Sequence, residues 1–133
     1  MAQVVLIENV VYEVDGLKGP KSVSTRRAAP VKTSRLESIV GSIIVESSNF
    51  VGSVKMKVKA CLGNITLLEE SHVLYSSAIP SSTRGRKPVE IPINLNFPSP
   101  VDVVVEFHLE VSAVVGYLRL TIERLAFSYQ ESS

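Results

Sequence analysis

The amino-acid sequence predicts an all-β protein, an antiparallel β-sandwich of seven or eight strands. The first observation is a period of two in the apolar residues of segments 54–62, 89–97 and 101–111. Successive side chains of a strand point to opposite faces, so this period gives each segment one buried face and one outer face. The second is that no segment shows the 3.6-residue apolar period of an amphipathic helix. The third is the turn chemistry between segments, such as Gly63-Asn64, which is typical of a two-residue hairpin.

The first predicted strand covers residues 4–14 and ends at the turn residues Asp15-Gly16. Alternate positions of this segment are apolar, with Glu8 as the exception: Val4, Leu6, Val10, Tyr12 and Val14. The segment has no basic start and is short, so it does not resemble a secretory signal peptide. We expect the protein not to be secreted by that route.

Residues 17–37 form a stretch with two prolines, small residues and little periodicity. This composition predicts an extended or mobile arm between the first two strands. It contains six basic residues and no acidic residue before Glu37: Lys18, Lys21, Arg26, Arg27, Lys32 and Arg35. A loop of this length without structure is usually functional or disordered.

The remaining strands follow from alternation and turn residues. Strands are predicted over 38–46, 53–62, 65–75, 89–97 and 101–111, with a bent strand or a last pair over the residues from 117 to 129. A parity change at Glu123-Arg124 indicates a bulge, and Pro92 indicates an edge strand or a bulge. Residues 76–88 are predicted to be a polar, basic loop. The core should include Val58, Val103, Val105, Phe107, Leu120 and Ile122.

The composition indicates a single domain with its own core. The chain has 133 residues, of which 45% are hydrophobic, and a net charge of +1. No run approaches the roughly 20 apolar residues of a membrane helix, so we expect no membrane contact. A single cysteine excludes an internal disulfide. The apolar content, with Val104, Val114 and Val115 on outer positions, suggests surface covered by other subunits.

The sequence contains no convincing catalytic or metal site. There is no GxSxG elbow and no phosphate-binding glycine motif. Glu106, His108 and Glu110 share one face of a predicted strand, but side chains spaced by two on a strand diverge, and metals need three or more converging ligands. A solvated face is the favoured interpretation of this stripe. We therefore predict a protein that is not an enzyme, with no catalytic residue, no metal and no cofactor.

The basic arm is the candidate partner-binding site. Three interpretations stay open: a solvated loop, docking onto an acidic surface of a neighbouring subunit, or contact with nucleic acid. Nucleic acid is the less favoured partner of the two, because single-strand binders pair basic charge with exposed aromatic residues. The arm has none, and the chain has no tryptophan.

Residues 43–77 resemble the strand-turn-strand core of small jelly-roll proteins of virus particles, of the phage capsid decoration and appendage type. The shared features are a serine-rich turn, a Gly-x-Val-x-x-x-Val strand and a Gly-polar hairpin: Ser47-Ser48-Asn49, Gly52, Val54, Val58 and Gly63-Asn64. Members often carry Asp-Gly and a following Trp where this chain has Asn64 and Ile65. No functional residue is carried over from the family.

The resemblance implies a jelly-roll topology and a structural virion component, such as a capsid decoration or minor capsid protein. Such a protein would assemble as a homo-oligomer, with a trimer favoured here, and would use an arm to contact neighbouring structural subunits. It would be found in the virion or in the cytoplasm of the producing cell. The alternative function is a non-catalytic β-sandwich module that binds a protein or a glycan.

Overall fold

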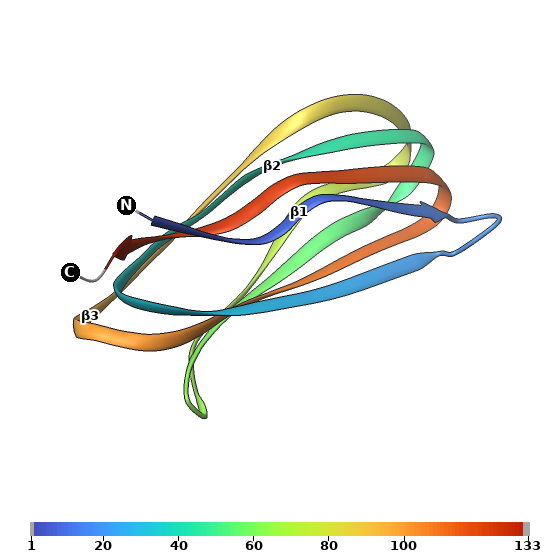
Figure 1. The fold of residues 1–133 in the computed structure, drawn as a ribbon. Coiled ribbons are helices and arrows are strands. Elements are labelled where there is room, and N and C mark those ends of the chain that lie inside the picture. Colours follow the sequence, from blue (N-terminus) through green and yellow to red (C-terminus); the bar gives the residue numbers. More distant parts are fainter. Residues whose placement is uncertain (1, 132–133) are drawn as a thin grey trace.

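A computed structural model describes residues 2–131, which form three strands joined by short turns (Figure 1). The strands are β1 (Ala2–Asp15), β2 (Ser22–Leu62) and β3 (Ile65–Glu131). All pairing is antiparallel, and this part of the chain contains no helix. Accordingly, no helix in residues 2–131 is long and apolar enough to cross a membrane. The predicted all-β, antiparallel fold class is confirmed.

The strands β2 and β3 bend and pass from one layer of the molecule to the other. Their pairing divides residues 2–131 into two sheets of four segments each. Sheet 1 has the spatial order 2–15, 117–131, 33–48 and 83–96, and sheet 2 has the order 22–33, 101–115, 50–62 and 65–81. Consecutive segments therefore lie in opposite sheets, except for the hairpin of 50–62 and 65–81 within sheet 2, and this is the jelly-roll arrangement of a β-sandwich.

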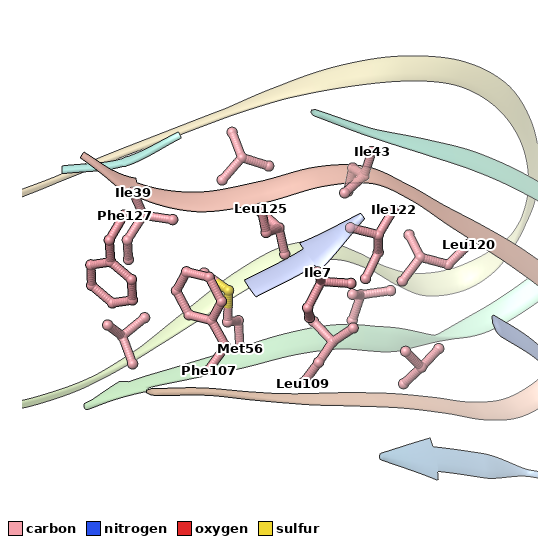
Figure 2. Packing of buried hydrophobic residues seen from close by; sticks show 14 of the residues in the cluster. Ile7, Ile39, Ile43, Met56, Phe107, Leu109, Leu120, Ile122, Leu125 and Phe127 are labelled. Carbon is pink, nitrogen blue, oxygen red and sulfur yellow. The ribbon is translucent and has the colours of Figure 1, made fainter. Parts of the chain in front are cut away.

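The core lies between the two sheets and follows the two-residue period (Figure 2). All six predicted core residues are fully buried: Val58, Val103, Val105, Phe107, Leu120 and Ile122. Phe107 of sheet 2 stacks on Phe127 of sheet 1, with ring centroids 4.7 Å apart. This aromatic pair joins the two layers near the middle of the core.

The predicted bulge at Glu123 is confirmed by the pairing between segments 33–48 and 117–131. Ser42 pairs with Arg124 and Ile43 with Ile122, so Glu123 is the extra residue. A Cβ on Gly41 would lie 1.9 Å from the Arg124 carbonyl oxygen, so only glycine fits beside the bulge. The bulge explains why the buried positions change from even to odd numbers along β3.

Residues 17–37 are not an extended arm, and here the sequence prediction was wrong. A tight turn ends at Pro20, and from Ser22 the chain is β2, paired along 22–33 with residues 101–112. Inward positions of this segment are buried at Val31 and Thr33. The two-residue apolar period of 22–33 could not be recognised in the sequence, because Arg27 occupies an inward position at the exposed edge of the sheet.

Residues 76–88 were predicted as a loop but belong to β3. They pair with residues 42–47 and 50–53 while crossing from sheet 2 to sheet 1. Their outer side has no neighbouring strand among the described residues, so polar side chains are tolerated there. The edge position of Pro92, opposite Ser38, is as the sequence predicted.

We expect Phe107→Ala to lower the free energy of unfolding by about 3–5 kcal/mol, because it leaves a cavity against Phe127. Urea denaturation followed by circular dichroism measures this loss. Val104→Ala, on the outer face of the same strand, is the matched control and should change stability by less than about 0.5 kcal/mol. A small effect of Phe107→Ala would contradict the observed register.

Candidate functional site

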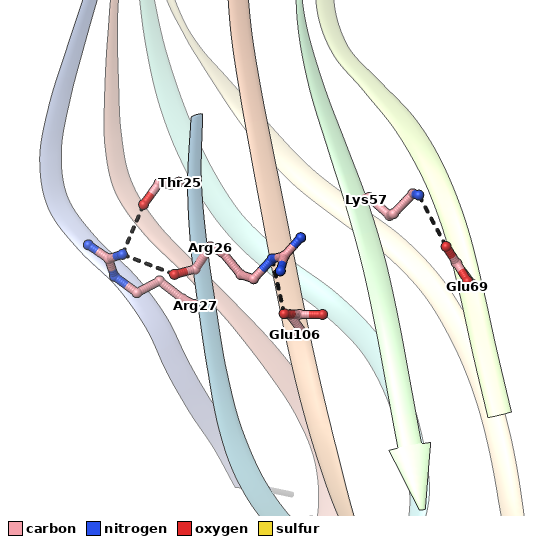
Figure 3. A network of polar contacts seen from close by, with 6 residues as sticks. All are labelled: Thr25, Arg26, Arg27, Lys57, Glu69 and Glu106. Carbon is pink, nitrogen blue, oxygen red and sulfur yellow. Dashed lines mark hydrogen bonds and ion pairs between the residues drawn. The ribbon is translucent and has the colours of Figure 1, made fainter. Parts of the chain in front are cut away.

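The six basic residues predicted as a partner-binding site are exposed but are not gathered into one cluster. Lys18 and Lys21 precede β2, Arg26, Arg27 and Lys32 lie on the edge segment of sheet 2, and Arg35 lies in the sheet 1 segment 33–48. The Arg26 Nε lies 3.2 Å from Glu106 Oε1, which partly neutralises both groups (Figure 3). Lys32 and Lys21 are also exposed, so the segment presents positive charge along most of its length.

Two of these arginines are held by neutral groups. The Arg27 Nη1 donates hydrogen bonds to Thr25 Oγ1 at 2.9 Å and to the Arg26 carbonyl oxygen at 3.1 Å (Figure 3). The Arg35 Nη2 lies 3.4 Å from Asn94 Oδ1. Because none of these acceptors is an acid, the charges of Arg27 and Arg35 stay available to a partner.

The outer face of sheet 2 carries a row of three lysines opposite a row of two glutamates and a histidine. Lys55, Lys57 and Lys59 on one segment lie opposite Glu110, His108 and Glu106 on the next. The Lys57 Nζ lies 3.1 Å from Glu69 Oε1 on the other side (Figure 3). This ammonium group lowers the pKa of the Glu69 carboxyl, mainly through the hydrogen bond and then through its charge.

A groove of about 430 Å³ opens on this charged face. It is lined by Lys55, Met56, Lys57, Ser71, His72, Val73, His108 and Glu110. His72 occupies an inward position of the edge segment, opposite the buried Met56, and its Nε2 lies 3.2 Å from Oε2 of Glu70 on the same side. The groove therefore combines hydrogen-bond donors and acceptors from three neighbouring segments.

Exposed apolar side chains gather at one end of the sandwich. Four turns meet there: around residues 16–20, at 48–49, around 79–82 and at 114–116. The apolar residues on these turns have large exposed fractions: Leu17 86%, Ile79 73%, Val114 69% and Val115 48%. We call these four residues the apolar end. They are four of the nine large apolar residues that are exposed in the described part of the chain.

The turns of the apolar end are tightly built. Asp15 Oδ1 accepts hydrogen bonds from the backbone nitrogens of Leu17 and Lys18 at 2.8 and 3.1 Å. These bonds lower the pKa of the Asp15 carboxyl. Gly116 has a φ of 77° and lies against the Asn49 carbonyl, where a Cβ would come within 2.1 Å. The end is therefore a fixed surface, with a hollow of about 400 Å³ lined by Asp15, Gly16, Leu17, Ser48, Asn49, Val114, Val115, Gly116 and Tyr117.

The sequence identified part of this surface. It placed Val114 and Val115 on outer positions, and both are exposed. It missed Leu17 and Ile79, because each stands in a stretch whose polar composition indicated a loop. It also missed the groove on sheet 2, which depends on the pairing of three segments distant in sequence. The available signals for that face were the alternating lysines at 55, 57 and 59 and the stripe of Glu106, His108 and Glu110.

The described residues contain no group of three or more His, Cys, Asp or Glu side chains able to hold a metal. In the predicted Glu-His-Glu stripe, Glu106 is instead bound by Arg26. The arrangement therefore offers two surfaces for binding, an apolar end and a polar groove.

No family model matches the chain, and no curated protein matches it. Several solved structures share its fold. A chain of the structure of infectious bursal disease virus Gx strain matches with a TM-score of 0.52 and 8% identity, over 96% of this chain and 31% of that one. The infectious bursal disease virus VP2 subviral particle matches with a TM-score of 0.50 and 10% identity, over 98% and 37%. This chain thus spans about a third of those virus chains.

The carbohydrate-binding module TmCBM61, in complex with β-1,4-galactotriose, matches with a TM-score of 0.49 and 16% identity, over 92% of this chain and 70% of that one. At these identities the likenesses show the β-sandwich fold alone.

We expect the pKa of Glu69 to be below the ordinary range of a glutamate, and to rise in Lys57→Met. Nuclear magnetic resonance titration of the side-chain carboxyl carbon measures both values. Because the pKa is lowered in the folded state, the pair stabilises the fold above the ordinary pKa, and this contribution is lost as the pH falls through the lowered value. Lys55→Met is the control and should leave the pKa of Glu69 unchanged. An equal rise in both variants would contradict the assigned contact.

Proposed function

We propose that this protein is a non-catalytic structural subunit of a virus particle, which assembles with copies of itself and contacts neighbouring structural subunits. The apolar end is the observation that carries this proposal. Apolar residues exposed singly are ordinary, but a group on three adjoining turns is typical of a surface covered by a protein partner. The jelly-roll fold, shared with the chains of infectious bursal disease virus, supports the same function.

A second copy of the chain is the partner that fits the apolar end. The projecting Leu17 and Ile79 and the hollow beside Val114 lie at the same end of the molecule. Leu17 or Ile79 of one copy can therefore enter the hollow beside Val114 of the next copy. Repeated around an axis at that end of the molecule, this contact can form a closed ring. Closed cyclic rings are the usual outcome for homo-oligomers. We propose a trimer, and the small net charge of +1 places little repulsion between its copies.

The sides of the sandwich complement each other in such a ring. Segments 22–33 and 65–81 are the opposite edges of sheet 2. Arg27 pairs with Phe107, which pairs with Val58, which pairs with Glu70, so Arg27 and Glu70 stand on the two edges in one row. When copies are arranged around an axis parallel to the strands, Arg27 of one copy faces Glu70 of the next. The basic edge thus contacts an acidic surface of the neighbouring subunit.

We expect Leu17→Ser combined with Val114→Ser to convert the oligomer to a monomer, because the substitutions remove the apolar contact without touching the core. Light scattering coupled to size exclusion measures the mass at high micromolar concentration. Ile65→Ser, on the hairpin away from the apolar end, is the matched control and should keep the oligomer. A monomeric wild-type protein at that concentration would refute the assembly.

We expect Arg27→Glu to weaken assembly, because the substitution places a carboxylate opposite Glu70 of the neighbouring copy. Adding Glu70→Arg to the same chain should restore assembly. The loss should shrink at high salt, since exposed charges are screened over about 8 Å at physiological ionic strength. Sedimentation velocity of the two single variants and the double variant measures this. Failure of the double variant to recover, with both single variants folded, would show that the two edges do not meet.

A further inference from the structure

The groove on the outer face of sheet 2 is independent of the apolar end and carries a different inference. Two rows of paired residues cross it, Val73–Lys55–Glu110 and Ser71–Lys57–His108. Its volume of about 430 Å³ is within the range of small-molecule sites, which is about 300–1,000 Å³. Val73 is 60% exposed and adds an apolar surface beside the polar groups.

The polar groups of the groove are only partly occupied by one another. Lys55 and Glu110 are paired across facing segments, yet among residues 2–131 neither takes part in an ion pair or a side-chain hydrogen bond. The ammonium of Lys57 is in contact with Glu69, but a lysine has three donors and can bind a second oxygen. The groove therefore offers strong donors at Lys55 and Lys57 and a strong acceptor at Glu110.

This mixture selects among ligand classes. A carboxylate matches the two ammonium groups. Hydroxyl groups both donate and accept, so they match the carboxylate of Glu110 and the hydroxyl of Ser71. A simple anion or a polyphosphate would gain nothing from Glu110 and would be repelled by it. A nucleic-acid strand would also need stacking surfaces, and no Phe or Tyr of the described residues lies on this face.

We propose that this groove binds a saccharide that carries a carboxylate, with the carboxylate at Lys55 and Lys57 and the sugar hydroxyls at Glu110 and Ser71. The charge contact takes the part that an aromatic platform plays in recognition of neutral sugars. The proposal does not rest on assembly: the side chains that would bind lie on the outer face of sheet 2, whereas Glu70, the edge residue that would face Arg27 of the next copy, occupies an inward position of the segment that also carries Ser71.

The test uses a trisaccharide of galacturonic acid as probe and isothermal titration calorimetry with the full chain. Its methyl ester, which keeps the hydroxyls and removes the charge, is the neutral probe, and triglutamate is a carboxylate probe without sugar hydroxyls. We expect the free acid to bind, and the ester and the peptide to bind at least about tenfold more weakly. No binding of the free acid, or equal binding of the ester or the peptide, would overturn the proposal.

Three substitutions separate this site from general electrostatic attraction. Lys55→Ser should weaken binding by about tenfold or more, while Lys59→Ser, on the same face but outside the groove lining, should not. Glu110→Gln removes a negative charge, so simple attraction of an anion would make binding tighter. Recognition of hydroxyls by Glu110 makes it weaker. Tighter binding in Glu110→Gln, or an equal loss in Lys59→Ser, would refute the assigned site.

The double variant Leu17→Ser with Val114→Ser, which is expected to be monomeric, should bind the probe as the wild type does. This result separates binding in the groove from the outcome of the assembly experiments.

Discussion

The structure depends on keeping one set of side chains between the two sheets while the chain crosses repeatedly from one sheet to the other. Because β2 and β3 continue through the bends, the apolar side chains must still face the core after each bend. Along 101–113 the odd-numbered residues are buried, whereas after the turn at Gly116 the even-numbered Leu118, Leu120 and Ile122 are buried. The corner therefore changes parity, and a slip of one residue there would turn an entire segment over. The tight backbone contact of Gly116 with Asn49 fixes this corner.

Bulges make the remaining adjustments within sheet 1. The extra residue at Glu123 changes the buried positions from even to odd numbers, so Leu125 and Phe127 face the core. The side chain of Glu123 itself makes contacts on the outer face of the sheet. Glu123 accepts hydrogen bonds from Ser42 and Arg86, each at 2.8 Å. These contacts, with that of Ser42 the stronger, lower the pKa of the Glu123 carboxyl. They also join three neighbouring segments of the sheet, so an irregularity of the ladder becomes a cross-strand connection. The lost ladder contact is thereby compensated by side chains.

Sequence reasoning was reliable where a segment is covered by neighbours on both sides and weak where a segment is an edge. In 101–111 every second residue is apolar, because a central segment buries one face completely. In 22–33 the inward positions include Arg27, and only Val31 and Thr33 are buried, so the same period is hidden. The groove and the apolar end could not be derived, since each is formed by segments that pairing brings together from distant parts of the sequence. The alternating lysines and the stripe of Glu106, His108 and Glu110 each marked one strand of the groove, but neither showed that the two strands are neighbours, and nothing marked the wall formed by Ser71 and Val73.

The edges of the sandwich also limit how it can associate. The 22–33 edge carries Arg27 at an inward position and Pro30, which has no amide hydrogen to donate. On β1, Asn9 has a φ of 52° near a bulge, and Pro92 interrupts the edge of sheet 1. These features oppose addition of a further strand, and so oppose open-ended growth of either sheet.

The blunted edges do not prevent copies of the chain from making contacts through side chains, either at one end of the sandwich or along its sides. Such contacts give a closed ring where the rotation between copies closes, and a filament where it does not. The blunted edges therefore leave side-chain contacts, at the apolar end and along the sides, as the route by which copies can associate.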